Sequence, residues 1–409
     1  VSYRQNKKRG CYRHTVATLF CCGLILIIVG VTCAVTNVFE EWVEDEIRDS
    51  VKLKEGNEVY DKWLHPENPV YLTFYMFNVT NAENASKGGV PDVQQHGPYT
   101  YRVVKNKTII SCNKYSSSSI TYISQKHHIF EKERSCKSCD PYHNSITNVN
   151  LPFLTTLKLI INYIKIKDPN SLSFALGVMD DIFLKLNLQD FHTHTVHELL
   201  WGYEDIALTK AHSILVGLAK SRDPTFNIEL PEKFALQQNI SSTLYTIDSG
   251  VTNVDNVGKF LLWNKKPNIS CWSDEYASMI NGSGGTHYKP FLSKDDIIYA
   301  LVTSTYRSFT LIYDSIVHYR GIRLYRFALD PKQFVPGDID GNNKGFCVTG
   351  KEKKCLPSGL MDLSNCYQSH APVVGSLPHF YMGNKSLLNA VHGLTPKKDL
   401  HGTFLDIEP

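Results

Sequence analysis

The sequence has little that would mark an enzyme or a nucleic-acid-binding protein. It contains no G-x-S-x-G nucleophile elbow, no P-loop and no dinucleotide-binding fingerprint. The glycine-rich stretch Gly282–His287 overlaps a glycosylation sequon and is interpreted as a tight loop. Lysine and arginine (43) barely exceed aspartate and glutamate (40), and there is no basic low-complexity tract and no internal repeat. Neither catalysis nor nucleic-acid binding is therefore indicated.

Charge is absent from residues 15–39, a run of 25 residues. Basic residues precede the run, namely Arg4, Lys7, Lys8, Arg9 and Arg13, and acidic residues follow it, namely Glu40, Glu41, Glu44, Asp45 and Glu46. As a helix this run spans roughly 37 Å, enough to cross a hydrocarbon core of about 30 Å. The positive-inside rule places the basic flank in the cytoplasm.

The run therefore predicts three regions: a cytoplasmic stub at 1–14, a transmembrane helix at 15–39 and an exoplasmic domain at 40–409. Without the five basic residues of the stub, the chain has 38 basic and 40 acidic residues, so the exoplasmic domain is nearly neutral. The alternative is a cleaved signal peptide, with small residues at Thr32 and Ala34. The run is longer than a usual signal peptide core, which favours an uncleaved anchor. Because the chain begins at Val1, we expect it to be a fragment at this end.

Seven N-x-S/T sequons all lie beyond the membrane run. They are Asn78, Asn84, Asn106, Asn239, Asn268, Asn281 and Asn384. Glycosylation takes place on the lumenal side, where the charge rule independently places this segment. The sequence thus predicts a glycoprotein.

The eleven cysteines divide between the membrane region and the exoplasmic domain. Cys11, beside the basic flank, is a candidate for S-palmitoylation, whereas Cys21, Cys22 and Cys33 are interpreted as apolar helix surface. The other seven lie in an oxidising space, where disulfides are expected.

Cys136 and Cys139 form a C-x-x-C pair, a spacing that in other settings suggests redox chemistry or half a zinc site. No thioredoxin-like pattern surrounds this pair. We expect instead a disulfide from Cys112 to one of the two, with one thiol left over.

Alternating and periodic patterns predict a mixed fold. Segments rich in β-branched and aromatic residues predict strands at Val70–Phe77, Tyr99–Val104, Ile120–Ser124 and Ile322–Leu329. Helical spacing predicts a two-helix hairpin in 151–188, an amphipathic helix in 44–60 and a helix starting near Asp295. Strands interrupted by helices imply an α+β class dominated by an antiparallel sheet.

His192, His194, His197 and Glu198 form a cluster of residue types that could bind a metal ion. On a strand, His192 and His194 share one face and are suited to ligating zinc. The spacing is not that of a known zinc motif, however, so we assign no metal and no cofactor.

Five motifs together resemble the class B scavenger receptor family. They are HGPYTYR at 96–102, VHELLWGYED at 196–205, MINGS at 279–283, LPHFY at 377–381 and HGTFLDIEP at 401–409. The family includes fatty-acid and lipoprotein receptors and the lysosomal integral membrane protein type II. The segment 194–203, HTVHELLWGY, most resembles the lysosomal member.

The resemblance implies an ectodomain with an antiparallel β-barrel core, a long hydrophobic tunnel and a helical bundle (151–197) at the apex. It also implies a second membrane span, before which this chain is expected to be truncated. Two disulfides are implied, Cys271 with Cys366 and Cys347 with Cys355. Phe346 stands where some plasma-membrane members have a further cysteine.

The resemblance further implies a receptor that binds lipoproteins or lipids and passes fatty acid or sterol through the tunnel to the bilayer. The expected partners are lipoprotein particles, fatty acids, sterols or phospholipids. Lysines of the hairpin, Lys158, Lys165, Lys167 and Lys185, are candidates for an apical basic patch that captures the ligand. Each is also compatible with an ordinary solvated helix face. The alternative function is a lysosomal sorting receptor that carries an acid hydrolase on its apical helices. The expected location is the plasma membrane or the lysosomal membrane, and homo-oligomerisation stays open.

Overall fold

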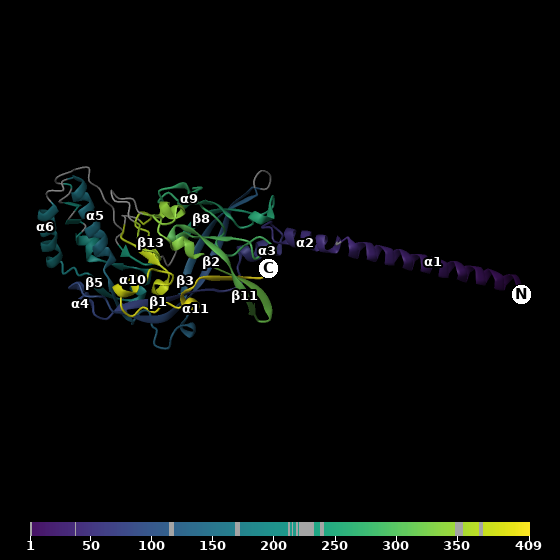
Figure 1. The fold of residues 1–409 in the computed structure, drawn as a ribbon, viewed down its shortest axis with the longest axis horizontal. Coiled ribbons are helices and arrows are strands. Elements are labelled where there is room, and N and C mark those ends of the chain that lie inside the picture. The colour runs from purple at the N-terminus through teal and green to yellow at the C-terminus, as the bar shows by residue number, and fades with distance from the viewer. Residues whose placement is uncertain are drawn as a thin grey trace.

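The computed structural model describes residues 2–36, 38–113, 118–167, 172–211, 213–214, 216–217, 220, 233–237, 241–347, 355–367 and 371–409. A long helix, α1, extends away from a body of sheets and short helices (Figure 1). The helices α2 and α3 and the last residues of the chain lie at the end of the body from which α1 departs, and α5 and α6 lie at the opposite end.

The helices vary from one turn to the 34 residues of α1. The α-helices are α1 (Ser2–Val35), α2 (Val38–Ser50), α3 (Glu58–Leu64), α4 (Ala82–Ser86), α5 (Leu151–Lys167), α6 (Leu172–Lys185), α7 (Val196–Trp201), α9 (Glu275–Ser278), α10 (Ser386–Ala390) and α11 (Lys398–His401). The shorter helical turns are η1 (Lys132–Arg134), the π-helical η3 (Ala207–Ala211), η4 (Val254–Asn256), η5 (Thr303–Thr305), η6 (Pro331–Phe334), η7 (Gly341–Phe346) and η9 (Pro378–Phe380).

The strands are antiparallel wherever two of them pair within the described residues. They are β1 (Val70–Val79), β2 (Val93–Asn113), β3 (Ser119–Phe130), β4 (Ser145–Val149), β5 (Phe191–Thr195), β6 (Tyr203–Glu204), β7 (Lys233–Phe234), β8 (Ser241–Asp248), β9 (Phe260–Trp263), β10 (Ile298–Val302), β11 (Arg307–Tyr319), β12 (Ile322–Leu329), β13 (Leu360–Asp362), β14 (Val374–Ser376) and β15 (Phe404–Ile407).

Two curled sheets form the main body. One has the strand order β1-β2-β3-β8-β9 and the other β10-β11-β12-β15. The segment at Gly282 and Ser283 joins them: Phe260 N–H donates to the Gly282 carbonyl at 2.9 Å, and Leu301 N–H donates to the Ser283 carbonyl at 3.0 Å. The two sheets are thereby connected edge to edge through one short stretch of backbone.

Apolar side chains fill several clusters against these sheets. Tyr99, Ile146, Leu199 and Leu200 form one cluster beside α7, each with 2% or less of its surface exposed. Another joins Trp63 of α3 to Tyr122 and Tyr245 of the five-stranded sheet, and a third lies around Phe327 of the four-stranded sheet. Burial of this apolar area is the main stabilising contribution to the fold.

Most of the predicted elements are present. The predicted strands fall within β1, β2, β3 and β12, and the predicted hairpin is α5 and α6. The mixed class with an N-terminal apolar helix is confirmed. The stretch Thr18–Val35 of α1 is long and apolar enough to cross a membrane.

Two predicted helices need correction. The helix expected near Asp295 is wrong, because Ile298 and Leu301 belong to strand β10, where they pair with Leu311 and Ser308 of β11. Long-range strand pairing overrides the helical spacing of the sequence here. The helix expected over 44–60 is interrupted between Ser50 and Glu58, where Gly56 takes a positive φ of 95°.

Candidate functional site

The helical hairpin is fixed to the body at its base. The side-chain Oδ1 of Asn150 accepts a hydrogen bond from Phe153 N–H at 3.0 Å, and its Nδ2 donates to the Gln189 carbonyl at 3.1 Å. The first bond is an N-cap, and the second ties the start of the hairpin to its end. Phe153 and Phe183 pack edge to face, 4.8 Å apart, together with Ala207 of η3. Buried apolar contacts and one buried amide thus hold the hairpin in place.

The structure places two of the four predicted patch lysines. Lys158 on α5 is half-buried, and Lys185 in the last turn of α6 is exposed, four residues after the exposed Asp181. The side chains of Lys165 and Lys167 lie outside the described residues. The patch therefore stays a prediction.

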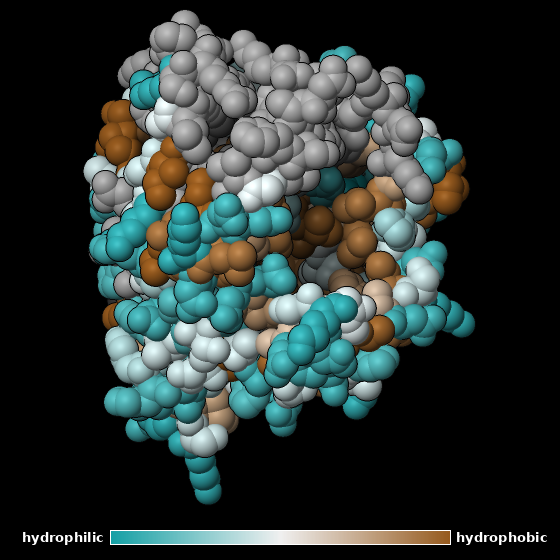
Figure 2. All heavy atoms as spheres, turned by 90° about the vertical axis from the view of Figure 1, so that its left-hand side faces the viewer, coloured by the Kyte–Doolittle hydropathy of each residue, from teal (hydrophilic) through white to brown (hydrophobic). Residues whose placement is uncertain are grey.

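The hairpin end of the molecule is hollowed. Figure 2, which faces this end, shows a recess whose walls carry hydrophobic residues. An open hollow of about 630 Å³ lies at the base of the hairpin, between the α4 segment and β5, and its lining includes Glu83, Lys87, Asp190 and His192. Both features lie at the end opposite α1, where a ligand from solution has access.

The histidine segment forms strand β5, which is followed by helix α7. Thr195 and Glu198 form a capping box: the Thr195 hydroxyl accepts from Glu198 N–H, and the Glu198 carboxylate accepts from Thr195 N–H. His192 and His194 share one face of the strand, and their rings are 4.7 Å apart. Burial and the neighbouring His194 lower the pKa of His192 to about 4, so this imidazole is neutral at physiological pH.

The side chain of His197 does not join His192 and His194. Its ring stacks on Tyr142 with 4.4 Å between centroids. Its backbone N–H donates to the Pro141 carbonyl at 2.7 Å. It is therefore separate from the pair formed by His192 and His194.

Three lysines occupy the buried face of the five-stranded sheet, and the sequence analysis did not identify them. Lys105 and Lys107 are two apart on β2, and Lys126 of β3 lies directly opposite Lys105. They share this face with the buried Tyr122 and Ser124. Burial lowers the pKa of all three, that of Lys107 to about 8, and the charge of Lys105 adds to the effect on the other two. The signal available in the sequence was the spacing K-x-K directly after the predicted strand Tyr99–Val104.

Within the described residues, no carboxylate forms an ion pair with these lysines. The Lys107 ammonium donates to the Trp63 carbonyl and lies 4.7 Å from the centroid of the Trp63 ring. Partly buried cations without acidic partners are costly, because desolvation is not offset by an opposite charge. This face of the sheet is accordingly suited to an anion supplied by a ligand.

Three disulfides are formed in the ectodomain. Cys271 pairs with Cys366, and Cys347 pairs with Cys355, the two bridges that the resemblance implies. Cys136 pairs with Cys139 over a sequence separation of 3. The expected bridge from Cys112 is therefore wrong: Cys112 is a free, exposed thiol near the end of β2, far along the strand from the loop that brings Cys136 beside Cys139.

The sequons lie mostly on exposed backbone. Asn84, Asn106, Asn268 and Asn384 are exposed, and Asn78 and Asn281 are half-buried. Asn239 lies outside the described residues, as does the side chain of Cys11. Glycosylation and palmitoylation therefore stay predictions.

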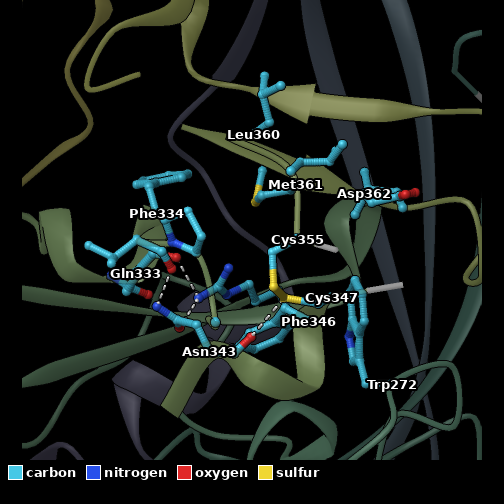
Figure 3. A pocket seen from close by; sticks show the side chains of 16 residues that line it. Trp272, Gln333, Phe334, Asn343, Phe346, Cys347, Cys355, Leu360, Met361 and Asp362 are labelled. Atoms are coloured by element: carbon cyan, nitrogen blue, oxygen red, sulfur yellow. Dashed lines mark hydrogen bonds between the residues drawn. A yellow bond between two sulfur atoms is a disulfide. The ribbon is translucent and has the colours of Figure 1, made fainter. Parts of the chain in front are cut away.

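A small cavity near the Cys347–Cys355 bridge has a structural role. It measures about 40 Å³, and Arg307 is one of the residues that line it. Figure 3 shows this cavity with Phe346 and the disulfide beside it. The guanidinium donates to the Gln333 carbonyl at 2.8 Å and to Asn343 Oδ1 at 3.2 Å, and it lies 3.7 Å from the centroid of the Phe346 ring. A cavity of this size holds a water molecule and not a lipid. Phe346, at the position of the absent cysteine, is thus the cation–π partner of a buried arginine.

These features define a membrane-anchored ectodomain with a hollowed far end. The chain belongs to the CD36 family, whose sequence model matches residues 21–409. It is similar to lysosome membrane protein 2 of Rattus norvegicus and of Homo sapiens, at 31% identity over 402 residues, covering 98% of this chain and 77% of each relative. It is also similar to scavenger receptor class B member 1 of Bos taurus, at 28% identity over 402 residues, covering 97% of this chain and 72% of that protein. The chain is accordingly a membrane receptor and not an enzyme.

Proposed function

We propose that this receptor binds lipoproteins or free lipids at its hairpin end and passes a fatty acid or sterol through the interior of the ectodomain to the bilayer. The single observation that carries the proposal is the set of lysines on the buried face of the sheet. Lys105, Lys107 and Lys126 are cations without acidic partners among the described residues, beside a large aromatic cluster. Such a face suits an amphiphile with an anionic head and an apolar chain.

The physical advantage of an interior path is large. At about 0.8 kcal/mol per methylene, a chain of about sixteen carbons meets a barrier near 13 kcal/mol if it is exposed to water. A covered apolar path removes most of this barrier without covalent chemistry. The hydrophobic walls of the recess in Figure 2 lie at the end where such a path would begin.

Uptake by cells that express the chain tests the proposal. The ligand is a lipoprotein labelled separately in its protein and its lipid, so that binding and lipid transfer are measured independently. Replacing Lys158, Lys165, Lys167 and Lys185 by Ala should lower binding, and replacing Lys105, Lys107 and Lys126 by Met should lower transfer of a fatty acid while binding persists.

The matched control replaces four exposed lysines elsewhere, Lys137, Lys265, Lys332 and Lys344, by Ala. It should behave as the unaltered chain in both measurements. Full transfer of fatty acid by the interior variant would contradict the interior path. Unchanged binding by the hairpin variant would contradict the basic patch.

A second candidate function is supported by the identity with lysosome membrane protein 2. In this function the hairpin carries an acid hydrolase to the lysosome. Co-precipitation of a lysosomal hydrolase with the full chain at neutral pH, and its release at pH 5, would favour this function over lipid transfer.

A further inference from the structure

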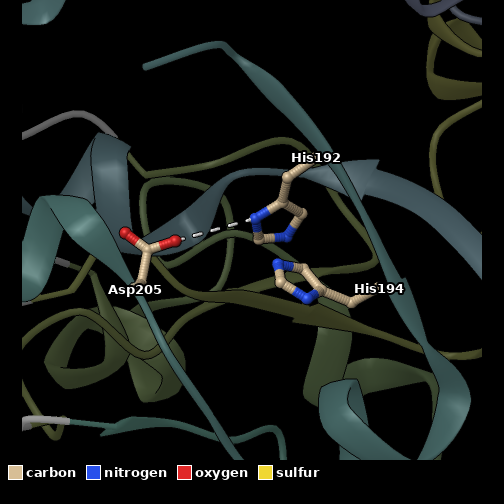
Figure 4. A group of neighbouring side chains, drawn as sticks. All are labelled: His192, His194 and Asp205. Atoms are coloured by element: carbon tan, nitrogen blue, oxygen red, sulfur yellow. Dashed lines mark ion pairs between the residues drawn. The ribbon is translucent and has the colours of Figure 1, made fainter. Parts of the chain in front are cut away.

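The pair formed by His192 and His194 gains a third potential ligand in the folded chain. Asp205 follows β6 and reaches the same point as the two imidazoles, which project from one face of β5 (Figure 4). One ligating atom of each residue lies within 4.8 Å of those of the other two. The sequence alone does not associate Asp205 with these histidines, because the approach of the two segments is a tertiary contact.

The orientation of each group suits a shared ion. His192 Nδ1 lies 4.0 Å from Asp205 Oδ2, too far for a direct hydrogen bond. His194 Nδ1 lies 3.6 Å from Glu198 Oε2, which leaves Nε2 of His194 available as the ligating nitrogen. A carboxylate behind a ligating histidine is the usual second-sphere arrangement of metal sites. The capping box of α7 fixes this carboxylate in place.

A backbone hydrogen bond also orients the Asp205 carboxylate toward the histidines. Its Oδ1 accepts from Ala207 N–H at 2.7 Å, which directs Oδ2 toward His192. The side chains of His192 and Asp205 are 12% and 9% exposed, and no lysine or arginine within the described part of the chain forms an ion pair with Asp205.

We propose that His192, His194 and Asp205 bind one divalent transition-metal ion of the Zn²⁺ type. Two imidazoles and a carboxylate are donors that such ions prefer. Bonds of about 2.0–2.2 Å place tetrahedral ligand atoms about 3.3 Å apart, so separations of up to 4.8 Å need to shorten by up to about 1.5 Å. His192 also lines the open hollow beside β5, which gives an ion and a water ligand access to the site.

An ion at this position ties together the two attachments of the helical hairpin. β5 continues from the end of the hairpin and pairs with β4, which precedes it. Asp205 lies just before η3, whose Ala207 packs against Phe153 and Phe183 of the hairpin. Metal binding would therefore stabilise the hairpin end relative to the rest of the body.

The experiment uses the full chain in detergent, purified with a tag that contains no histidine and stripped with EDTA. After incubation with Zn²⁺ and removal of excess ion, metal content is measured by mass spectrometry, and Co²⁺ replaces Zn²⁺ in a parallel absorption measurement. We expect one Zn²⁺ per chain, a Co²⁺ spectrum typical of four-coordinate N/O ligation and an increase of the melting temperature with Zn²⁺.

The variants are Asp205→Asn and His192→Gln, and the matched control is His197→Gln, whose ring lies outside the cluster. Both cluster variants should bind at least tenfold more weakly, whereas the control should bind as the unaltered chain does. Failure of the folded, unaltered chain to retain Zn²⁺ would overturn the proposal and leave His192 and His194 as aromatic packing partners of Tyr203. Equal retention by Asp205→Asn would overturn it as well. The unaltered chain is tested first and by itself, so its result decides the proposal even if a variant misfolds.

Discussion

The lysines on the buried sheet face predict a pH dependence of fatty-acid binding. The pKa of Lys107 is about 8 before an anion binds. A carboxylate needs the charged form of this lysine, whereas at pH 9 only about one-tenth of the side chain is protonated. At pH 9 the lysine must first take up a proton before it binds the carboxylate. Binding at pH 9 is therefore about tenfold weaker than at pH 7, which corresponds to about 1.4 kcal/mol. The lowered pKa values of Lys105 and Lys126 act in the same direction.

The assay is a titration of the full chain in detergent with a fluorescent long-chain fatty acid at pH 7, 8 and 9. The carboxyl group of the ligand can only become more ionised between pH 7 and pH 9, so its own titration does not account for the loss of the lysine–carboxylate attraction. Lys107→Met should bind more weakly at pH 7 and lose most of the dependence on pH. Lys265→Met, which changes an exposed lysine, should bind as the unaltered chain does. Equal affinity at pH 7 and pH 9, or the same decrease in Lys107→Met, would show that Lys107 does not bind the carboxylate.

Three further predictions concern stability. The Cys271–Cys366 bridge closes a separation of 95 residues, so its removal should lower the free energy of unfolding by about 4.7 kcal/mol in the chain-entropy model. Removal of the Cys347–Cys355 bridge, with a separation of 8, should lower the melting temperature less. Gly282→Ala should cost about 3 kcal/mol, because φ is +82° and an added Cβ would lie 2.0 Å from the Tyr299 carbonyl oxygen; an unchanged melting temperature would contradict this. Protonation of His379 should destabilise the fold as the pH falls.

The acid effect at His379 follows from its surroundings. Burial, with the nearby His401 and Lys397, lowers the pKa of His379, and its Nδ1 accepts a hydrogen bond from Thr395 N–H at 3.1 Å. The unfolded chain therefore takes up a proton at a higher pH than the folded chain, and stability decreases as pH falls below about 6.5. His379→Gln should show a smaller loss of melting temperature between pH 7 and pH 5 than the unaltered chain.

The sequence was sufficient for the parts of the fold that rest on local patterns. The uncharged run, the two hairpin helices and strand β12 have a strong period or composition, and each is present. The segment at Ile298 has helical spacing but becomes a strand, because its partner Leu311 is supplied by β11. Pairing between distant segments is not encoded in a local window.

In the candidate sites, too, some residues can be identified from local sequence and others only from the fold. The histidines on β5 were found from the sequence, but Asp205 joins them only through the fold. Lys105, Lys107 and Lys126 are recognised as one group only from the register of β2 and β3, which places them on one buried face. The bridge between Cys136 and Cys139 was missed because their loop, and not their spacing alone, brings the two thiols together.

The most direct test of an interior lipid path is cross-linking with a photoreactive long-chain fatty acid, bound to the full chain and mapped by mass spectrometry. We expect labelled peptides from β2, β3 and α3, around Lys107, Tyr122 and Trp63. An excess of unlabelled fatty acid should abolish this labelling. Labelling confined to α1, or to exposed surface without competition, would contradict it.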